Sequence, residues 1–127
     1  MVIDCDVIVR FLTRDNIKKA DRFDKFLHSG KKGKLTDVTF AEIYWLLSSF
    51  YKLSKKKILM LLESLIGHSS IVCNKKLLLM TISILKNYNI SFVDAYNSSF
   101  SLLKDDNKIM SYDRDFDKLP GIKRIEP

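Results

Sequence analysis

Paired carboxylates follow two short apolar runs, one near each end of the 127-residue sequence. Asp4 and Asp6 lie in the stretch VIDCD, and Asp113 and Asp115 lie in SYDRDF, directly after the apolar run KIM. If both runs are strands of one parallel sheet, their acids meet at the carboxyl edge, where such sheets bind ligands. The alternative is a local role, because an Asp in this position often caps a helix or forms a turn.

Two further acids lie in stretches with helical periodicity. Glu42, in TFAEIYWLLSSF, has Val38 and Trp45 among its helical neighbours, so its face is largely apolar. Asp94, in FVDAYNSSF, shares a helical stripe with Asn97. The structural alternatives are a Glu42 head that reaches solvent or a lysine, and an Asp94 that caps its helix.

The joint placement of these acids predicts a metal site. Carboxylates gathered at one place repel one another and raise their own pKa values unless they hold a cation. An oxygen-only ligand set favours Mg²⁺ or Mn²⁺. His28 and His68 lie at expected helix ends and are assigned surface roles, while Cys5 and Cys73 lack a CxxC spacing and are expected to be small, reduced core residues.

The elements that position the acids follow from periodicity and from cap residues such as Ser54 and Gly67. Alternation of strands with helices implies a mainly parallel sheet covered on both faces, within one domain spanning residues 1–127. The expected strands cover residues 2–5, 34–37, 70–73, 108–112 and 122–125, and the expected helices cover residues 7–13, 16–28, 38–51, 54–66, 75–89 and 92–104.

The charge balance favours a polyanionic partner. Lys and Arg total 22 against 15 acids, which gives a net charge of +7. Without the six acids named above, the remaining surface carries 22 − 9 = +13, which suits a nucleic acid that must reach a metal. The apolar runs are too short for a membrane span, and the acidic N-terminus does not suit a signal peptide, so we expect a cytoplasmic protein.

Three stretches together resemble the PIN-domain ribonucleases, and among them the VapC-type toxins of toxin-antitoxin pairs. VIDCDVIVRFLTRDN is similar to the family's opening, TFAEIYWLLSSFYKLSKKKILMLLESL to its middle segment, and ISFVDAYNSSFSLLKDDNKIMSYDRDFDKLPGI to its closing half. The sequence has Cys5 where the family usually has Thr or Ser, and Asn97 where it usually has a small apolar residue.

The resemblance implies an α/β fold, a three-layer α/β/α sandwich whose central, mainly parallel sheet has about five strands. It implies a Mg²⁺- or Mn²⁺-dependent endoribonuclease that hydrolyses RNA with a metal-activated water, acts as a toxin, forms a homodimer and is inhibited by a cognate antitoxin. The implied catalytic and metal-binding acids are Asp4, Glu42, Asp94 and Asp113, with Asp6, Ser111, Asp115 and Asn97 as accessory residues and Arg10, Arg14 and Arg114 as RNA contacts. Asp115 is the alternative to Asp113 as fourth acid.

Two other functions fit the same residues. A haloacid-dehalogenase-type phosphatase also opens with Asp-x-Asp, with Asp4 as nucleophile, and would require Thr36, Lys75 and Asp113 in its remaining roles. That assignment leaves Glu42 unexplained. A catalytically silent PIN-like module that binds RNA or an antitoxin is the non-enzymatic alternative.

Overall fold

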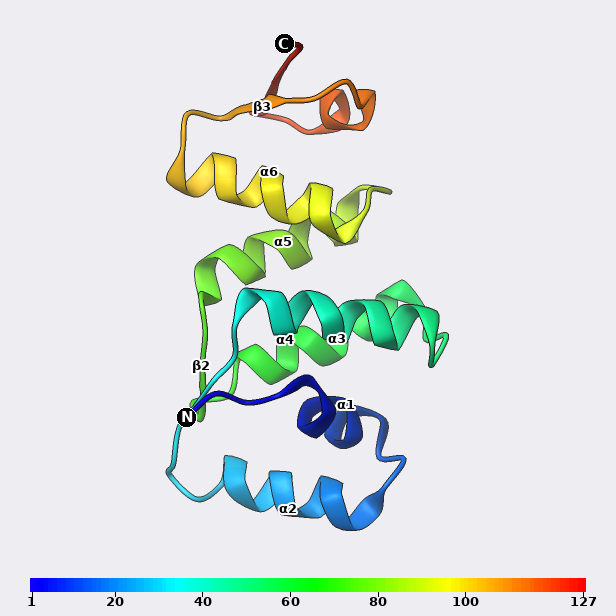
Figure 1. Ribbon diagram of the computed structural model, residues 1–127, viewed down its shortest axis with the longest axis vertical. Coiled ribbons are helices and arrows are strands. Elements are labelled where there is room, and N and C mark those ends of the chain that lie inside the picture. Colours follow the sequence, from blue (N-terminus) through cyan, green and yellow to red (C-terminus); the bar gives the residue numbers. More distant parts are fainter. The chain divides into compact units, whose positions relative to one another are not determined.

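The computed structural model describes residues 1–127, which form two compact units, residues 1–75 and 76–127 (Figure 1). Each unit combines helices with a two-stranded parallel sheet. The first unit contains α1 (Cys5–Thr13), α2 (Ile17–Leu27), β1 (Gly33–Lys34), α3 (Asp37–Ser49), α4 (Lys55–Ile66) and β2 (Ile71–Val72). Helix α5 (Lys75–Asn87) begins at the last residue of the first unit and otherwise belongs to the second, which also contains α6 (Phe92–Lys104), β3 (Lys108–Met110), the 3-10 helix η1 (Arg114–Lys118) and β4 (Lys123–Ile125).

Strand β1 has a parallel neighbour on each side. It pairs with β2, and Lys34 also forms a parallel bridge with Val2 near the N-terminus. The Ile3 N–H donates to the Lys34 carbonyl at 2.9 Å. A Cβ at Gly33 would collide with the Ile3 side chain, so glycine allows this close approach. The predicted parallel pairing is therefore confirmed in the first unit.

The expected strands over residues 2–5 and 34–37 are too long, because helices begin inside both ranges. Asp4 has extended backbone and caps α1, which starts at Cys5. Thr36 caps α3 by accepting a hydrogen bond from the Thr39 N–H at 3.2 Å, so Asp37 is helical. Each strand segment therefore runs directly into a helix N-terminus, which brings the following acids close to the strand end.

Helix packing builds the core of the first unit. Helix α1 contacts α2 and α3, and α3 contacts α4. The buried apolar side chains include Ile8, Phe40, Ile43, Leu47, Ile58, Leu62 and Ile66. This packing fixes α1 against α3, the two helices that carry the acids of the first unit.

The second unit joins β3 and β4 in parallel through a connection that contains η1. The Ser101 hydroxyl donates to the Lys108 carbonyl at 3.0 Å and ties α6 to β3. Phe116 of η1 and Leu119 just after it are buried. These contacts hold the loop after β3 against α6.

The predicted helices agree closely with the structure. The range of α6 is as expected, α5 ends two residues early at Asn87 instead of residue 89, and Ser54 and Gly67 cap α4 as expected. The helix η1 is the one element that the sequence did not predict. The molecule is thus an α/β protein with six α-helices and short parallel strands, and none of its helices is long and apolar enough to cross a membrane.

Candidate metal centre

Three of the predicted acids line one pocket in the first unit. Asp4 and Asp6, at the start of α1, and Glu42, on the second turn of α3, border a cavity of about 260 Å³. All three residues are exposed. Glu42 is not on a buried apolar face, because its neighbours Val38 and Trp45 are 80% and 61% exposed. The pocket is therefore open to solvent and to a charged ligand.

Cys5 lines the same pocket as these three acids. Cys5 is buried, and burial is the main reason that its pKa is raised to about 11. The negative charges of Glu42, Asp4 and Asp6, in that order, raise the pKa further. The three carboxylates therefore act on the same point, and the thiol stays protonated at neutral pH. Cys5 is a core residue, as predicted, whereas Cys73 is only half-buried; both are free thiols.

A hydrogen-bonded network at the rim of this pocket includes residues that the sequence did not predict. The Arg10 guanidinium pairs with Asp6 at 3.2 Å and with Asp15 at 3.1 Å, and the Tyr51 hydroxyl donates to Asp15 at 2.9 Å. The Tyr51 hydrogen bond is the main cause of the lowered pKa of Asp15. Arg10 forms an ion pair with Asp6. The other two acids of this set, Asp4 and Glu42, have no ion pair with a cation.

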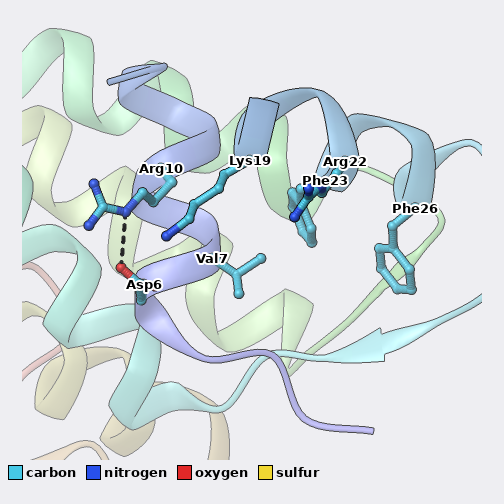
Figure 2. A pocket seen from close by; sticks show the side chains of 7 residues that line it. All are labelled: Asp6, Val7, Arg10, Lys19, Arg22, Phe23 and Phe26. Carbon is cyan, nitrogen blue, oxygen red and sulfur yellow. Dashed lines mark hydrogen bonds and ion pairs between the residues drawn. The ribbon is translucent and has the colours of Figure 1, made fainter. Parts of the chain in front are cut away.

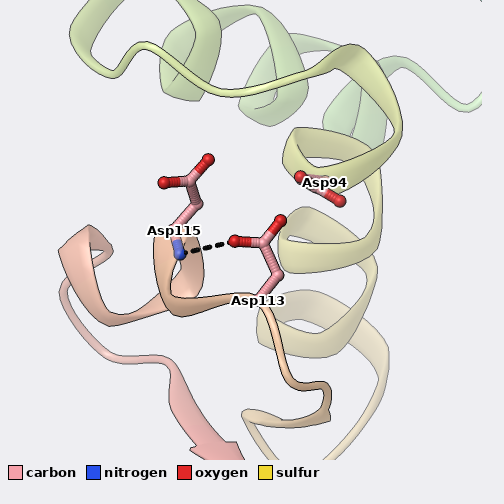
Figure 3. Close-up of side chains that lie close together, drawn as sticks. All are labelled: Asp94, Asp113 and Asp115. Atoms are coloured by element: carbon pink, nitrogen blue, oxygen red, sulfur yellow. Dashed lines mark hydrogen bonds between the residues drawn. The ribbon is translucent and has the colours of Figure 1, made fainter.

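The second unit gathers a second set of acids (Figure 3). Asp94 of α6 and Asp113 and Asp115 around the start of η1 each offer a carboxylate oxygen, and these oxygens all lie within 4.8 Å of one another. Asp94 and Asp115 are half-buried, whereas Asp113 is exposed. The structure therefore brings the two predicted acids Asp94 and Asp113 together, and Asp115 joins them.

Short hydrogen bonds fix the loop that carries two of these acids. The Ser111 hydroxyl accepts from the Asp113 N–H at 2.9 Å, and an Asp113 carboxylate oxygen accepts from the Asp115 N–H at 2.8 Å. Asp115 also pairs with Lys118 at 2.9 Å. Asp113 thus caps η1 and remains the more available carboxylate, while Lys118 partly neutralises Asp115.

The alternative in which Asp94 caps α6 is wrong. Ser91 is the N-cap, and its hydroxyl accepts from the Asp94 N–H at 3.1 Å. The Asp94 carboxylate is therefore not needed for the cap and faces Asp113 and Asp115.

The cap assignment makes a stability prediction. We expect Ser91→Ala to lower the free energy of unfolding by about 0.5–2 kcal/mol, because it deletes the capping hydroxyl. Asp94→Asn should cost less, since it leaves the cap intact and removes carboxylate repulsion. Urea denaturation of both variants in EDTA measures the difference. An equal loss for Asp94→Asn would show that its carboxylate supports the helix.

The donor chemistry of both sets fits a hard divalent cation. Each set offers three carboxylates, and Mg²⁺ and Mn²⁺ prefer oxygen ligands. Cys5 also lines the pocket of the first set, but its thiol stays protonated at neutral pH and a metal ligand would have to be the thiolate. Acids on neighbouring elements that converge in this way repel one another without a cation. Residues 1–75 thus present Asp4, Asp6 and Glu42, and residues 76–127 present Asp94, Asp113 and Asp115.

The remaining predicted residues lie around these sets. Asn97 is exposed on α6, and Arg114 is exposed at the start of η1. Arg14 pairs with Asp21 at 2.8 Å. His28 is the C-cap of α2, and the centroid of its ring lies 5.6 Å from that of the His68 ring. Neither histidine belongs to an acid set.

Comparison with protein families identifies the fold. A family model described as "PIN domain" matches residues 1–122 and so spans both units. The chain belongs to the PIN domain family. No curated protein shows significant sequence similarity to it.

Membership in the family indicates which reaction the acids support. PIN domains are generally nucleases, which supports a hydrolase acting on phosphodiester bonds. They typically use divalent metals, in agreement with the carboxylate donors of both sets. The phosphatase alternative is not retained, because the match to the PIN domain covers 122 of the 127 residues.

Proposed function

We propose that this PIN domain is an endoribonuclease that depends on Mg²⁺ or Mn²⁺. The observation that carries the proposal is the pair of carboxylate sets, in which Asp4 and Asp6 follow the Val2 segment, and Asp113 and Asp115 follow β3. Carboxyl ends of parallel strands are where α/β proteins build their sites. Outside the six site acids the chain has 22 bases and 9 acids, which favours a polyanionic phosphodiester substrate such as RNA.

The proposal joins the two acid sets in one site. We propose Asp4, Glu42, Asp94 and Asp113 as the four acids that hold the cation, with Asp6, Asp115, Ser111 and Asn97 in supporting roles. A single family model over both units supports one nuclease domain.

The residues of the chain would hold and orient the reacting groups. The Ser111 hydroxyl and the cap of η1 fix the direction of Asp113, and the Ser91 cap fixes the first turn that carries Asp94. Arg10 compensates the charge of Asp6, which limits repulsion within the first set. A bound divalent cation supplies Lewis-acid activation of water and neutralises charge on the scissile phosphate.

We further propose that the protein is a VapC-type toxin. Support comes from the resemblance of its opening, middle and closing stretches to that group. The proposed partners are RNA, a cognate antitoxin whose C-terminal segment enters the acidic cleft, and a second copy of the chain. Expression in the cytoplasm without the antitoxin should then arrest cell growth, and Asp4→Asn should relieve that arrest.

The biochemical test is metal-dependent cleavage of RNA. Purified protein should cut single-stranded RNA in Mg²⁺ or Mn²⁺ and leave 5′-phosphate and 3′-hydroxyl ends, because water attacks the phosphorus and the 3′ oxygen is the leaving group. EDTA should stop the reaction, and excess Mn²⁺ should restore it. Cleavage that continues undiminished in EDTA would refute the metal mechanism, and RNA binding without any cleavage would favour the silent module.

A further inference from the structure

A second pocket lies between α1 and α2, within residues 1–75 (Figure 2). Its volume is about 350 Å³, which falls in the range of about 300–1,000 Å³ typical of small-molecule sites. Asp6 and Arg10 line this pocket and also the acidic pocket, so the two adjoin. We call it the hairpin pocket, lined by Asp6, Val7, Arg10, Lys19, Arg22, Phe23 and Phe26.

The hairpin pocket has more positive than negative charge. Three cations, Arg10, Lys19 and Arg22, face one acid, Asp6. Arg10 is held by Asp6 and Asp15, whereas the exposed side chains of Lys19 and Arg22 form no ion pair. Two cationic groups thus remain for an external anion, and both belong to α2 and line the pocket (Figure 2).

Aromatic rings form the apolar part of the same pocket. The rings of Phe23 and Phe26 stack with their centroids 5.6 Å apart and an interplanar angle of 19°. Phe23 is buried, Phe26 is half-buried, and Val7 is 41% exposed opposite them. A flat apolar ring beside unpaired cations matches a nucleotide, whose base stacks on aromatic side chains and whose phosphate attracts Lys and Arg.

We propose that the hairpin pocket is a nucleotide subsite for the RNA strand, with a phosphate at Lys19 and Arg22 and a base against Phe26 and Val7. This inference rests on the proposed function and adds to it the place where the strand is held beside the metal-binding acids. An RNA strand is favoured over an acidic protein segment because the pocket joins unpaired cations to an aromatic surface, and because it adjoins the cleft through Asp6.

The test compares two double variants on the same helix. Lys19→Gln/Arg22→Gln removes both cations of the pocket, and Lys18→Gln/Lys25→Gln removes two exposed cations of α2 that do not line it. Binding of a short fluorescent single-stranded RNA is measured by anisotropy in EDTA over a series of salt concentrations, so cleavage plays no part. The pocket variant should flatten the slope of log K against log salt by about 1.4, the effect of two phosphate contacts, and the control should change it little.

A third variant tests the aromatic contact. Phe26→Leu keeps an apolar side chain but removes the ring, and we expect it to weaken RNA binding about fivefold or more. Circular dichroism and thermal melts establish that each variant is folded. Equal losses of RNA affinity in the two double variants would overturn the subsite. It would also be overturned if the pocket variant lost binding to a poly-glutamate peptide but kept its binding to RNA. No RNA binding by the wild type would overturn the proposed function together with the subsite.

Discussion

Asp94→Asn should lower the rate of RNA cleavage at least a hundredfold, while leaving the protein folded. The variant keeps the shape of the side chain and the Ser91 cap but removes a negative oxygen ligand from the cluster with Asp113 and Asp115. Residues that only support metal ligands typically contribute about 10–100-fold, so loss of a direct ligand should cost at least the upper end of that range. The measurement is the initial rate on labelled single-stranded RNA at saturating Mg²⁺.

The matched control for this variant is Asp105→Asn. Asp105 lies at the end of the same helix and is exposed, so it reproduces the charge change without touching the cluster. Its cleavage rate should stay within about twofold of the wild type, the size expected for a surface change outside the site. Equal rates for Asp94→Asn and the wild type would remove Asp94 from the proposed site.

The helices of this protein could be predicted because each carries enough residues to show its period. Ser54 and Gly67 mark both ends of α4, and the expected range of α6 agrees with the structure. The strands were harder to predict, because β1 and β2 contain two residues each, too few for an alternating pattern. The expected strand over residues 2–5 failed for a further reason: Asp4 caps a helix as well as lining the acidic pocket.

Contacts of the site between residues close in sequence could be predicted, whereas contacts between residues far apart in sequence could not. The sequence placed acids after the strands, and Arg10 could have been connected with Asp6 from their spacing of four residues on one helix. By contrast, Asp15 and Tyr51 are 36 residues apart in sequence and meet through folding alone. No periodicity or motif in the sequence predicts that contact.

Substitution of one acid in either unit should weaken metal binding. Asp4→Asn changes the first unit, and Asp94→Asn changes the second. If both carboxylates hold the same cation, each substitution should lower its affinity about tenfold or more, by analogy with the loss that supporting residues already produce. The control Asp24→Asn, on α2 outside the acidic pocket, should bind metal like the wild type.

The proposal that Asp4 and Asp94 hold the same cation is tested most directly by a double-mutant cycle for Mn²⁺ binding. Free Mn²⁺ is followed by electron paramagnetic resonance in titrations of wild type, Asp4→Asn, Asp94→Asn and the double variant. We expect both single variants to lose affinity for the same ion, with a combined loss smaller than the sum of the two, because groups that share one ligand are energetically coupled. Wild-type Mn²⁺ affinity in Asp4→Asn, with loss in Asp94→Asn alone, would contradict a shared site.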